Sequence, residues 1–237
     1  MFAGHKLRRS RKTIEDVSYI TQAQVAGPLT VVTHTGISIG VAATHRYVVC
    51  CETNLSQPTL GLAVVSATIG GVSATILATH DAANGSNALV TWYMAKVPTG
   101  ATANIVITFN RDTSGVGSQI FVYTVTPSSN SSTIDLFDSL SESITTTGDT
   151  TVLSTPSITT VEGGVVLCGA LQRNGLAGSF TGGVSTTDYS ADILTADWAT
   201  IGHVLTTGAD IDCEVTTTDT GLLTQEFKGV AISLRAI

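Results

Sequence analysis

The amino-acid sequence predicts an all-β fold, and three observations support this prediction. The 237 residues include 39 Thr and 22 Ser with few Lys, Glu and Gln, a composition poor in helix formers and rich in strand formers. Apolar residues make up 43% of the chain and charged residues only 12%, so a sizeable core can form. Short β-rich runs recur with Gly, Asn, Pro or Ser between them. We therefore expect one large β-sandwich of jelly-roll type that follows an extended N-terminal arm.

The expected arm comprises residues 1–27, and its first part is strongly basic. Five of the eleven basic residues fall in the first twelve positions, where no acid occurs: Lys6, Arg8, Arg9, Arg11 and Lys12. This segment carries +5, whereas the other 6 basic and 18 acidic residues give the rest of the chain −12. Such a segment docks onto a phosphate backbone, onto an acidic patch of a neighbouring subunit, or remains a loose terminus.

The second part of the expected arm mixes polar and apolar residues. Ile14, Val17, Tyr19 and Ile20 supply its apolar side chains, and the spacing of three from residue 14 to 17 to 20 fits helical turns or an irregular strap on another surface. Gly27 and Pro28 mark the boundary to the body, residues 28–237.

The body contains twelve candidate strands. They are residues 29–33, 37–41, 46–51, 60–67, 73–78, 88–95, 103–109, 119–125, 151–153, 164–171, 210–215 and 229–235. No long run keeps a helical period, so βαβ units are not expected. The segment from Pro127 to Thr150 is rich in Ser and Thr and reads as a surface loop. Two smaller sandwiches that separate near this segment are the alternative to one large sandwich.

The sequence contains no recognisable catalytic, metal or cofactor motif. The four cysteines, Cys50, Cys51, Cys168 and Cys213, lie inside candidate strands without metal-ligand spacing, and we expect them to be buried free thiols. The five histidines are scattered, and neither a nucleophile elbow nor a phosphate-binding glycine loop occurs. We therefore expect a protein that is not an enzyme and binds no cofactor.

Aromatic and acidic residues suggest two weaker hypotheses. Trp92, Tyr189 and Trp198 are candidates for a stacking platform that binds a glycan. Asp188, Asp192 and Asp197 gather around Tyr189 and Trp198, and paired carboxylates of this kind can hydrolyse a glycosidic bond. Packing of the aromatic residues in a local core is the competing interpretation.

Neither a membrane span nor a signal peptide is visible. No run approaches the roughly 18 to 20 apolar residues that a span requires, and no apolar run lies close behind the basic cluster. We expect no membrane partner.

Several strand and turn motifs resemble β-rich structural proteins of tailed bacteriophages. They are Arg46–Val49, Thr68–Thr75, Lys96–Gly100, Ile120–Val125 and the final run Gly229–Arg235. The resemblance extends over about two thirds of the chain and rests on no catalytic residue. It implies a role in the virion, as a capsid decoration protein or as a component of a tail or fibre.

The leading functional hypothesis is thus a phage virion structural protein, assembled in the host cytoplasm. Its expected partners are capsid or tail subunits and further copies of itself, with only weak, non-specific contact to nucleic acid through the arm. The basic residues of the arm would bind acidic surfaces, and its apolar residues would anchor it. The alternative is a carbohydrate-binding or adhesin module of a tail or spike.

Overall fold

The computed structural model describes residues 11–55, 61–80, 88–113, 117–147, 150–154, 157–173, 178–184, 186–194, 197–218 and 224–237. Within these ranges the chain forms antiparallel strands and no helix. The prediction of an all-β sandwich fold is therefore confirmed.

The N-terminal half of the chain forms two sheets, which we call sheet A and sheet B. Sheet A has the order β1 (Ile14–Val25), β9 (Ser118–Pro127), β3 (Tyr47–Leu55), β7 (Ala88–Lys96) and β6 (Thr75–His80). Sheet B has the order β2 (Val31–Ser38), β8 (Thr102–Phe109), β4 (Val64–Ile69) and β5 (Val72–Ser73).

The C-terminal half forms sheet C and sheet D. Sheet C has the order β10 (Ile134–Thr147), β17 (Thr224–Ala236), β12 (Val165–Arg173), β15 (Asp197–Leu205) and β14 (Thr186–Leu194). Sheet D has the order β11 (Thr150–Ser154), β16 (Cys213–Thr218) and β13 (Gly178–Gly182).

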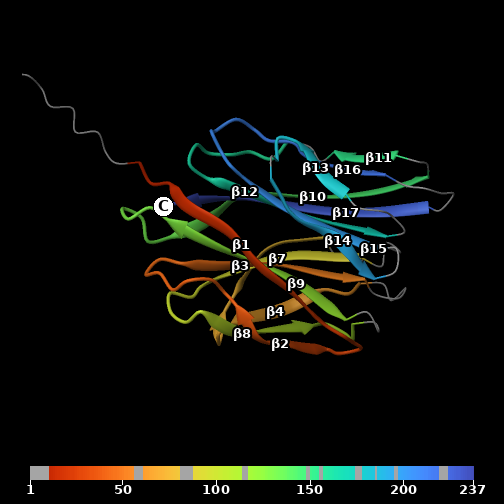
Figure 1. Ribbon diagram of the computed structural model, residues 1–237, viewed down its shortest axis with the longest axis horizontal. Helices are drawn as coiled ribbons and strands as arrows, with labels where there is room; N and C mark the ends of the chain where they lie inside the picture. Colours follow the sequence, from red (N-terminus) through yellow and green to blue (C-terminus); the bar gives the residue numbers. More distant parts are fainter. Residues whose placement is uncertain are drawn as a thin grey trace, which may run out of the picture.

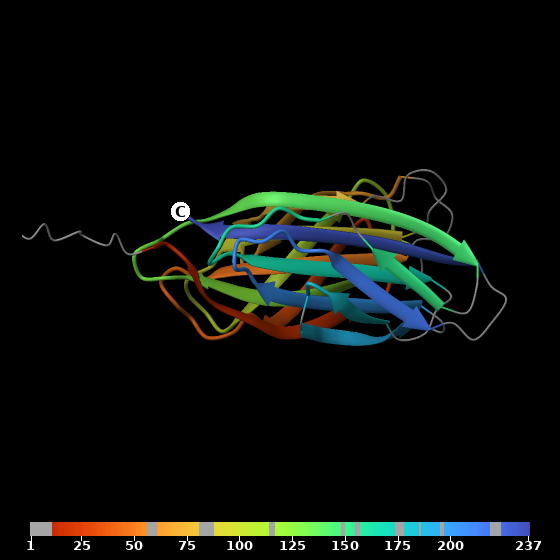
Figure 2. The ribbon, with the colours of Figure 1, turned by 90° about the horizontal axis from the view of Figure 1, so that it is seen from above.

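The four sheets are stacked as layers in the order D, C, A, B, from top to bottom in Figure 1. Three apolar cores separate them: one between A and C, one between A and B, and one between C and D. Both faces of sheet A are covered, which explains why nearly every residue of β7 and β9 is buried. Figure 2 shows the strands running along the long axis of the molecule, with the C-terminus at one end.

The two halves repeat one strand order. In sheet A the order is β1-β9-β3-β7-β6, and in sheet C it is β10-β17-β12-β15-β14. Taken in chain order, β10, β12, β14, β15 and β17 of sheet C occupy the positions that β1, β3, β6, β7 and β9 occupy in sheet A. The order β2-β8-β4 of sheet B likewise returns as β11-β16-β13 in sheet D. The body is thus a pair of similar sandwiches that pack through their five-stranded sheets.

Two expectations about the organisation of the chain need correction. The body is not one sandwich of two sheets; it divides near Pro127, where the alternative placed the break. The segment 127–150 is not mainly a loop, because β10 occupies Ile134–Thr147 and pairs with β17 along its length. Its Thr residues favour extended backbone, and pairing with β17 from Ile134 to Thr147 makes the segment a strand.

Candidate functional site

Residues 14–25 of the expected arm belong to the body. They form strand β1, which pairs with β9 at the edge of sheet A. Ile14 is buried, and Val17, Tyr19 and Ile20 pack against the two cores that sheet A borders. The prediction of an arm is therefore wrong for this segment.

The unusual spacing of the apolar residues in β1 has a simple cause. The register of β1 against β9 shifts between Ile14 and Asp16 and again between Tyr19 and Thr21. Each irregularity interrupts the two-residue alternation of a strand. The spacing of three that suggested helical turns or a strap is thus produced by a strand with irregular pairing.

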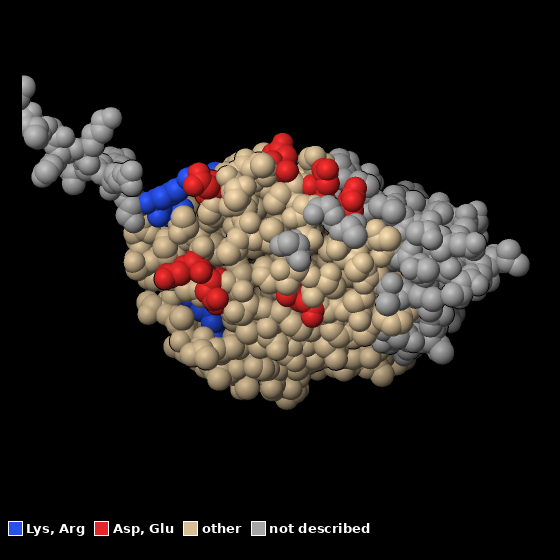
Figure 3. Space-filling view, turned by 45° about the horizontal axis from the view of Figure 1, so that its top comes forward, with Lys and Arg blue, Asp and Glu red and all other residues tan. Residues whose placement is uncertain are grey.

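Arg11 and Lys12, the described part of the basic segment, lie at the end of the molecule that also holds the C-terminus. Lys6, Arg8 and Arg9 fall outside the described residues. Arg11 forms an ion pair with Glu162, and both side chains are more than half exposed. Lys12 is exposed as well. Figure 3 shows basic and acidic side chains gathered beside each other at this end.

A hollow of about 330 Å³ lies between the two ends of the chain. It is lined by Arg11, Lys12, residues 161–163 and residues 235–237. Arg235 pairs with Asp135 at 3.2 Å and lies over the ring of Phe137. Arg11 and Arg235 both have acidic partners within the chain, so Lys12 is the cation of this lining for which the described residues show no ion pair.

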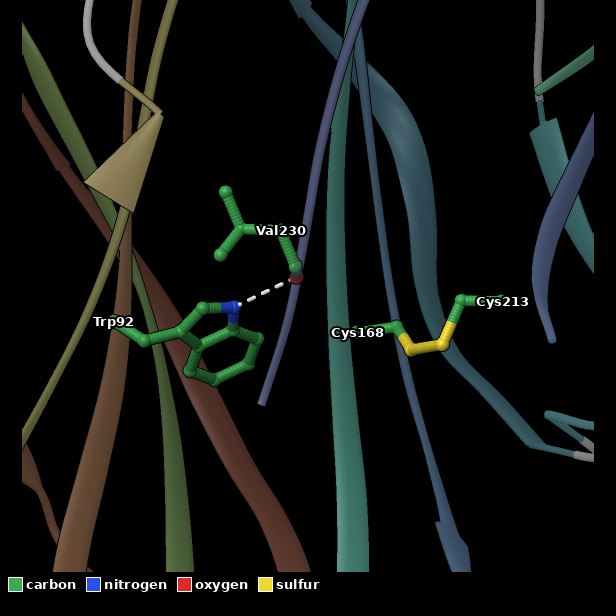
Figure 4. The surroundings of a disulfide bond; sticks show 4 residues. All are labelled: Trp92, Cys168, Cys213 and Val230. Carbon is green, nitrogen blue, oxygen red and sulfur yellow. Dashed lines mark hydrogen bonds between the residues drawn. A yellow bond between two sulfur atoms is a disulfide. The ribbon is translucent and has the colours of Figure 1, made fainter. Parts of the chain in front are cut away.

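The structure does not form the expected glycan platform. Trp92 is fully buried between sheets A and C, where its indole N–H donates to the carbonyl oxygen of Val230 at 3.0 Å (Figure 4). Tyr189 packs against the same core, with its ring centre 4.9 Å from that of Phe121. Trp198 is only partly exposed. A buried indole cannot stack on a sugar, so the prediction is wrong for Trp92.

Of the three acids in the predicted cluster, the structure describes the side chain of Asp188, which belongs to a hydrogen-bonded group. The Asp188 carboxylate accepts from the Tyr123 hydroxyl at 2.6 Å and from His203 Nδ1 at 2.7 Å. The side chains of Asp192 and Asp197 lie outside the described residues. Burial, followed by the nearby Asp188 carboxylate, raises the pKa of Tyr123 well above its usual value. This group links β9 of one sandwich to β14 and β15 of the other.

A second polar group is fully buried between sheets A and B. Ser118 Oγ donates to Glu52 Oε2 at 2.9 Å and lies 2.9 Å from His34 Nε2. Since the single hydroxyl hydrogen of Ser118 goes to Glu52, His34 Nε2 must be the donor to Ser118. Burial raises the pKa of Glu52 well above its usual value and lowers that of His34 to about 4. The three side chains are at most 1% exposed, so they are not arranged to meet a substrate.

The cysteines follow the prediction only in part. Cys50 and Cys51 are buried free thiols, as expected. Cys168 on β12 and Cys213 on β16 instead form a disulfide that joins sheet C to sheet D (Figure 4). Their separation of 45 residues gave no motif that could have revealed the pairing. No group of three or more His, Cys, Asp or Glu side chains in the described ranges is arranged to hold a metal ion.

No protein-family model matches the chain, and no curated protein matches it either. The part of the chain that the structure describes also contains no helix long and apolar enough to cross a membrane. The candidate functional region that we consider further is the basic N-terminal segment, together with the end of the body that holds Arg11 and Lys12.

Proposed function

We propose that the protein is a structural protein of a tailed-bacteriophage virion that attaches to other virion subunits through its basic N-terminal segment, residues 1–12. The main observation behind this proposal is the uneven distribution of charge: residues 1–12 carry +5 and the rest of the chain carries −12. Opposite charges on two parts of one subunit favour contacts between subunits over contacts with nucleic acid alone. The likeness of residues 46–125 and 229–235 to phage structural proteins supports the choice of a virion.

The strand order supports a jelly-roll interpretation of each sandwich. The first sandwich has eight strands when β6 is left out, and we number these eight in chain order. One sheet then contains the first, eighth, third and sixth strands, and the other contains the second, seventh, fourth and fifth. Two interlocked Greek keys give this arrangement, which is frequent in viral capsid and lectin domains. The fold alone permits both classes, and the charged segment supports the proposal of a virion protein.

The contacts at the terminal end separate the cations that are already paired within the chain from those proposed for attachment. Glu162 pairs with Arg11 and Asp135 with Arg235, so these two arginines already have partners in the body. Lys12 has no ion pair among the described residues and is exposed. Lys12 and the basic residues of positions 1–10 are thus the groups proposed to bind the acidic surface of a capsid or tail subunit. The protein then acts as a decoration or fibre-type component present in many copies.

Neutralising two arginines tests this role. The test variant Arg8→Ala/Arg9→Ala lowers the charge of the segment by two. The control variant Thr44→Glu/Ser129→Glu lowers the charge of the body by the same amount, at two exposed turn positions. Each variant is produced during infection by the phage that encodes it, and its copy number in purified particles is measured. We expect at least a tenfold loss for the arginine variant, because several charge-assisted contacts are removed, and none for the control. Undiminished incorporation of Arg8→Ala/Arg9→Ala contradicts the proposal.

A further inference from the structure

The outward face of sheet B forms regular rows of small side chains. Across the four strands Thr33 pairs with Val106, Val106 with Thr68, and Thr68 with Ser73. The neighbouring row contains Val31, Thr108 and Ser66. We call these seven residues the outer face of sheet B; their strand neighbours, such as Val32, Ile105 and Ala67, point into the core.

This sheet is unusual because it contains no charge. Its strands β2, β8, β4 and β5 contribute 8, 8, 6 and 2 residues, and none of these is Lys, Arg, Asp or Glu. The only His, His34, is buried against Ser118. A sheet face in contact with water normally carries charged residues, which also prevent association. Each of the other three sheets contains at least one charged residue, such as Glu52 in sheet A, Asp135 in sheet C and Glu214 in sheet D.

Part of the exposed apolar surface lies at the same place. Seven large apolar side chains of the described ranges are exposed, and three of them, Leu29, Val31 and Val65, belong to β2 or β4 or adjoin them. Val72 is exposed too, but it pairs with the buried Ile69 and so lies on the other face of the sheet. Val31 is 50% exposed and Val65 59% exposed. Apolar side chains gathered on one surface indicate an interaction site more strongly than the same number scattered singly.

We propose that the outer face of sheet B binds the same face of a second copy of this chain, around a two-fold axis. The copies each carry a net charge of −7 and repel one another, and this face is where two of them approach without facing charges. Rows of β-branched Thr and Val are self-complementary, as an isologous contact requires. This inference goes beyond the attachment proposed above, because it involves no residue of the basic segment.

The size of the sheet sets the strength of this contact. Three strands of 6 to 8 residues and one of 2 residues, about 4.8 Å apart, present on the order of 350–400 Å² per copy. The pair buries about 700–800 Å², which is below the size of a stable dimer interface, so we expect a weak, concentration-dependent contact. In an assembly with many copies, weak contacts of this size add through multivalency.

Solution mass tests the inference. Light scattering and sedimentation velocity are recorded from about 5 to about 500 µM, a range that spans the affinities of small interfaces. We expect the wild-type mass to rise from monomer toward dimer. Thr33→Lys/Thr68→Lys places two lysines on either side of Val106 in each copy, and we expect the dissociation constant to increase at least tenfold. Thr44→Lys/Ser129→Lys adds the same charge at exposed turns outside the sheet and should dimerise like the wild type.

Two further measurements separate this contact from one made by the basic segment. Higher salt should leave the sheet B dimer intact, whereas it weakens an ionic contact. A chain that starts at Arg11 should still dimerise, even if the attachment role of residues 1–12 fails its own test. If circular dichroism shows that the double lysine variant does not fold, Ser66→Lys at a more exposed position replaces it. A wild type that is monomeric at the highest concentration, or a folded lysine variant that dimerises normally, overturns the inference.

Discussion

The contact between Gly169 and Cys51 shows how closely the two sandwiches pack. A Cβ atom at Gly169 would lie 2.8 Å from Cys51 Sγ and 3.3 Å from the Trp92 ring. The two residues also occupy corresponding places, the fifth position of β12 and of β3. The halves thus meet at equivalent points, where one residue must be glycine because its counterpart has a side chain.

Gly169→Ala should therefore destabilise the protein, by about 1–3 kcal/mol as is typical of overpacking. Cys51→Ala removes the sulfur that the new methyl group meets, so the double variant should be more stable than the sum of the single effects predicts. Urea unfolding of the wild type, both single variants and the double variant measures this coupling. Strictly additive effects would show that the two residues do not compete for space.

The buried group of His34, Ser118 and Glu52 contains two titratable side chains, His34 and Glu52. Their effects on the pH dependence of the free energy of unfolding oppose each other in the wild type. Burial lowers the pKa of His34 to about 4, so His34 alone makes stability fall as the pH drops from about 6.5 to 4. Burial raises the pKa of Glu52 above its usual 4.5, so the folded state keeps a proton that the unfolded state loses, and Glu52 alone makes stability fall as the pH rises above 4.5. Between about 4.5 and 6.5 the two slopes oppose each other.

Glu52→Gln removes one of these slopes and keeps the hydrogen bond from Ser118. We expect the free energy of unfolding of this variant to rise with pH between about 4 and 6.5, by on the order of 1 kcal/mol per pH unit. His34→Gln should show the opposite sign, with stability falling as the pH rises above 4.5. Urea titrations at five pH values give both curves. Parallel curves for the two variants would contradict the assignment of neutral side chains to this core.

At the scale of elements, β1 decides where the body begins. Ile14 donates its N–H to Gly163 at 2.7 Å, and β1 covers the side of β9 that would otherwise be an open edge. A chain that starts at Arg11 should therefore fold like the full chain, whereas one that starts at Pro28 should lose its cooperative thermal transition. Circular dichroism and calorimetry of both chains test this. A stable, cooperative chain from Pro28 would restore the interpretation of residues 14–25 as an arm.

The disulfide between β12 and β16 should stabilise the second sandwich. A cross-link across 45 residues restricts the unfolded chain, which is worth about 2–4 kcal/mol. Cys168→Ala/Cys213→Ala should lower the urea midpoint, and dithiothreitol should lower that of the wild type toward the same value. The reductant should not affect the variant, because Cys50 and Cys51 are already free. An unchanged wild-type midpoint in dithiothreitol would exclude this role.

Several elements were predictable and others were not, for physical reasons. The apolar runs at 88–95, 103–109, 119–125 and 164–171 correspond to β7, β8, β9 and β12, because strands buried on one or both faces have strong β-rich patterns. Strand β14 (Thr186–Leu194) contains Asp, Ser and Thr at an edge of sheet C, where pairing with β15 outweighs local preference. Its neighbour β15 was missed together with it.

At the scale of the whole molecule, the repeat of strand order was invisible in the sequence. Equivalent strands take the same places in their sheets, but their residues differ. Cys51 and Gly169 illustrate this, because they meet in one core where only one of them has room for a side chain. The charged N-terminal segment was recognisable because it depends on composition alone. The roles of Trp92, Asp188 and the disulfide were not, since they depend on contacts between strands far apart in the chain.

The presence of the protein in virus particles is the most direct test of the proposed role. Particles purified from infected cells by density gradient, with and without a high-salt wash, are analysed by quantitative mass spectrometry. The proposal predicts many copies of the protein per particle and their partial release by salt, because attachment through residues 1–12 is ionic. Absence of the protein from purified particles, with all of it recovered in the free fraction, would contradict a role in the virion.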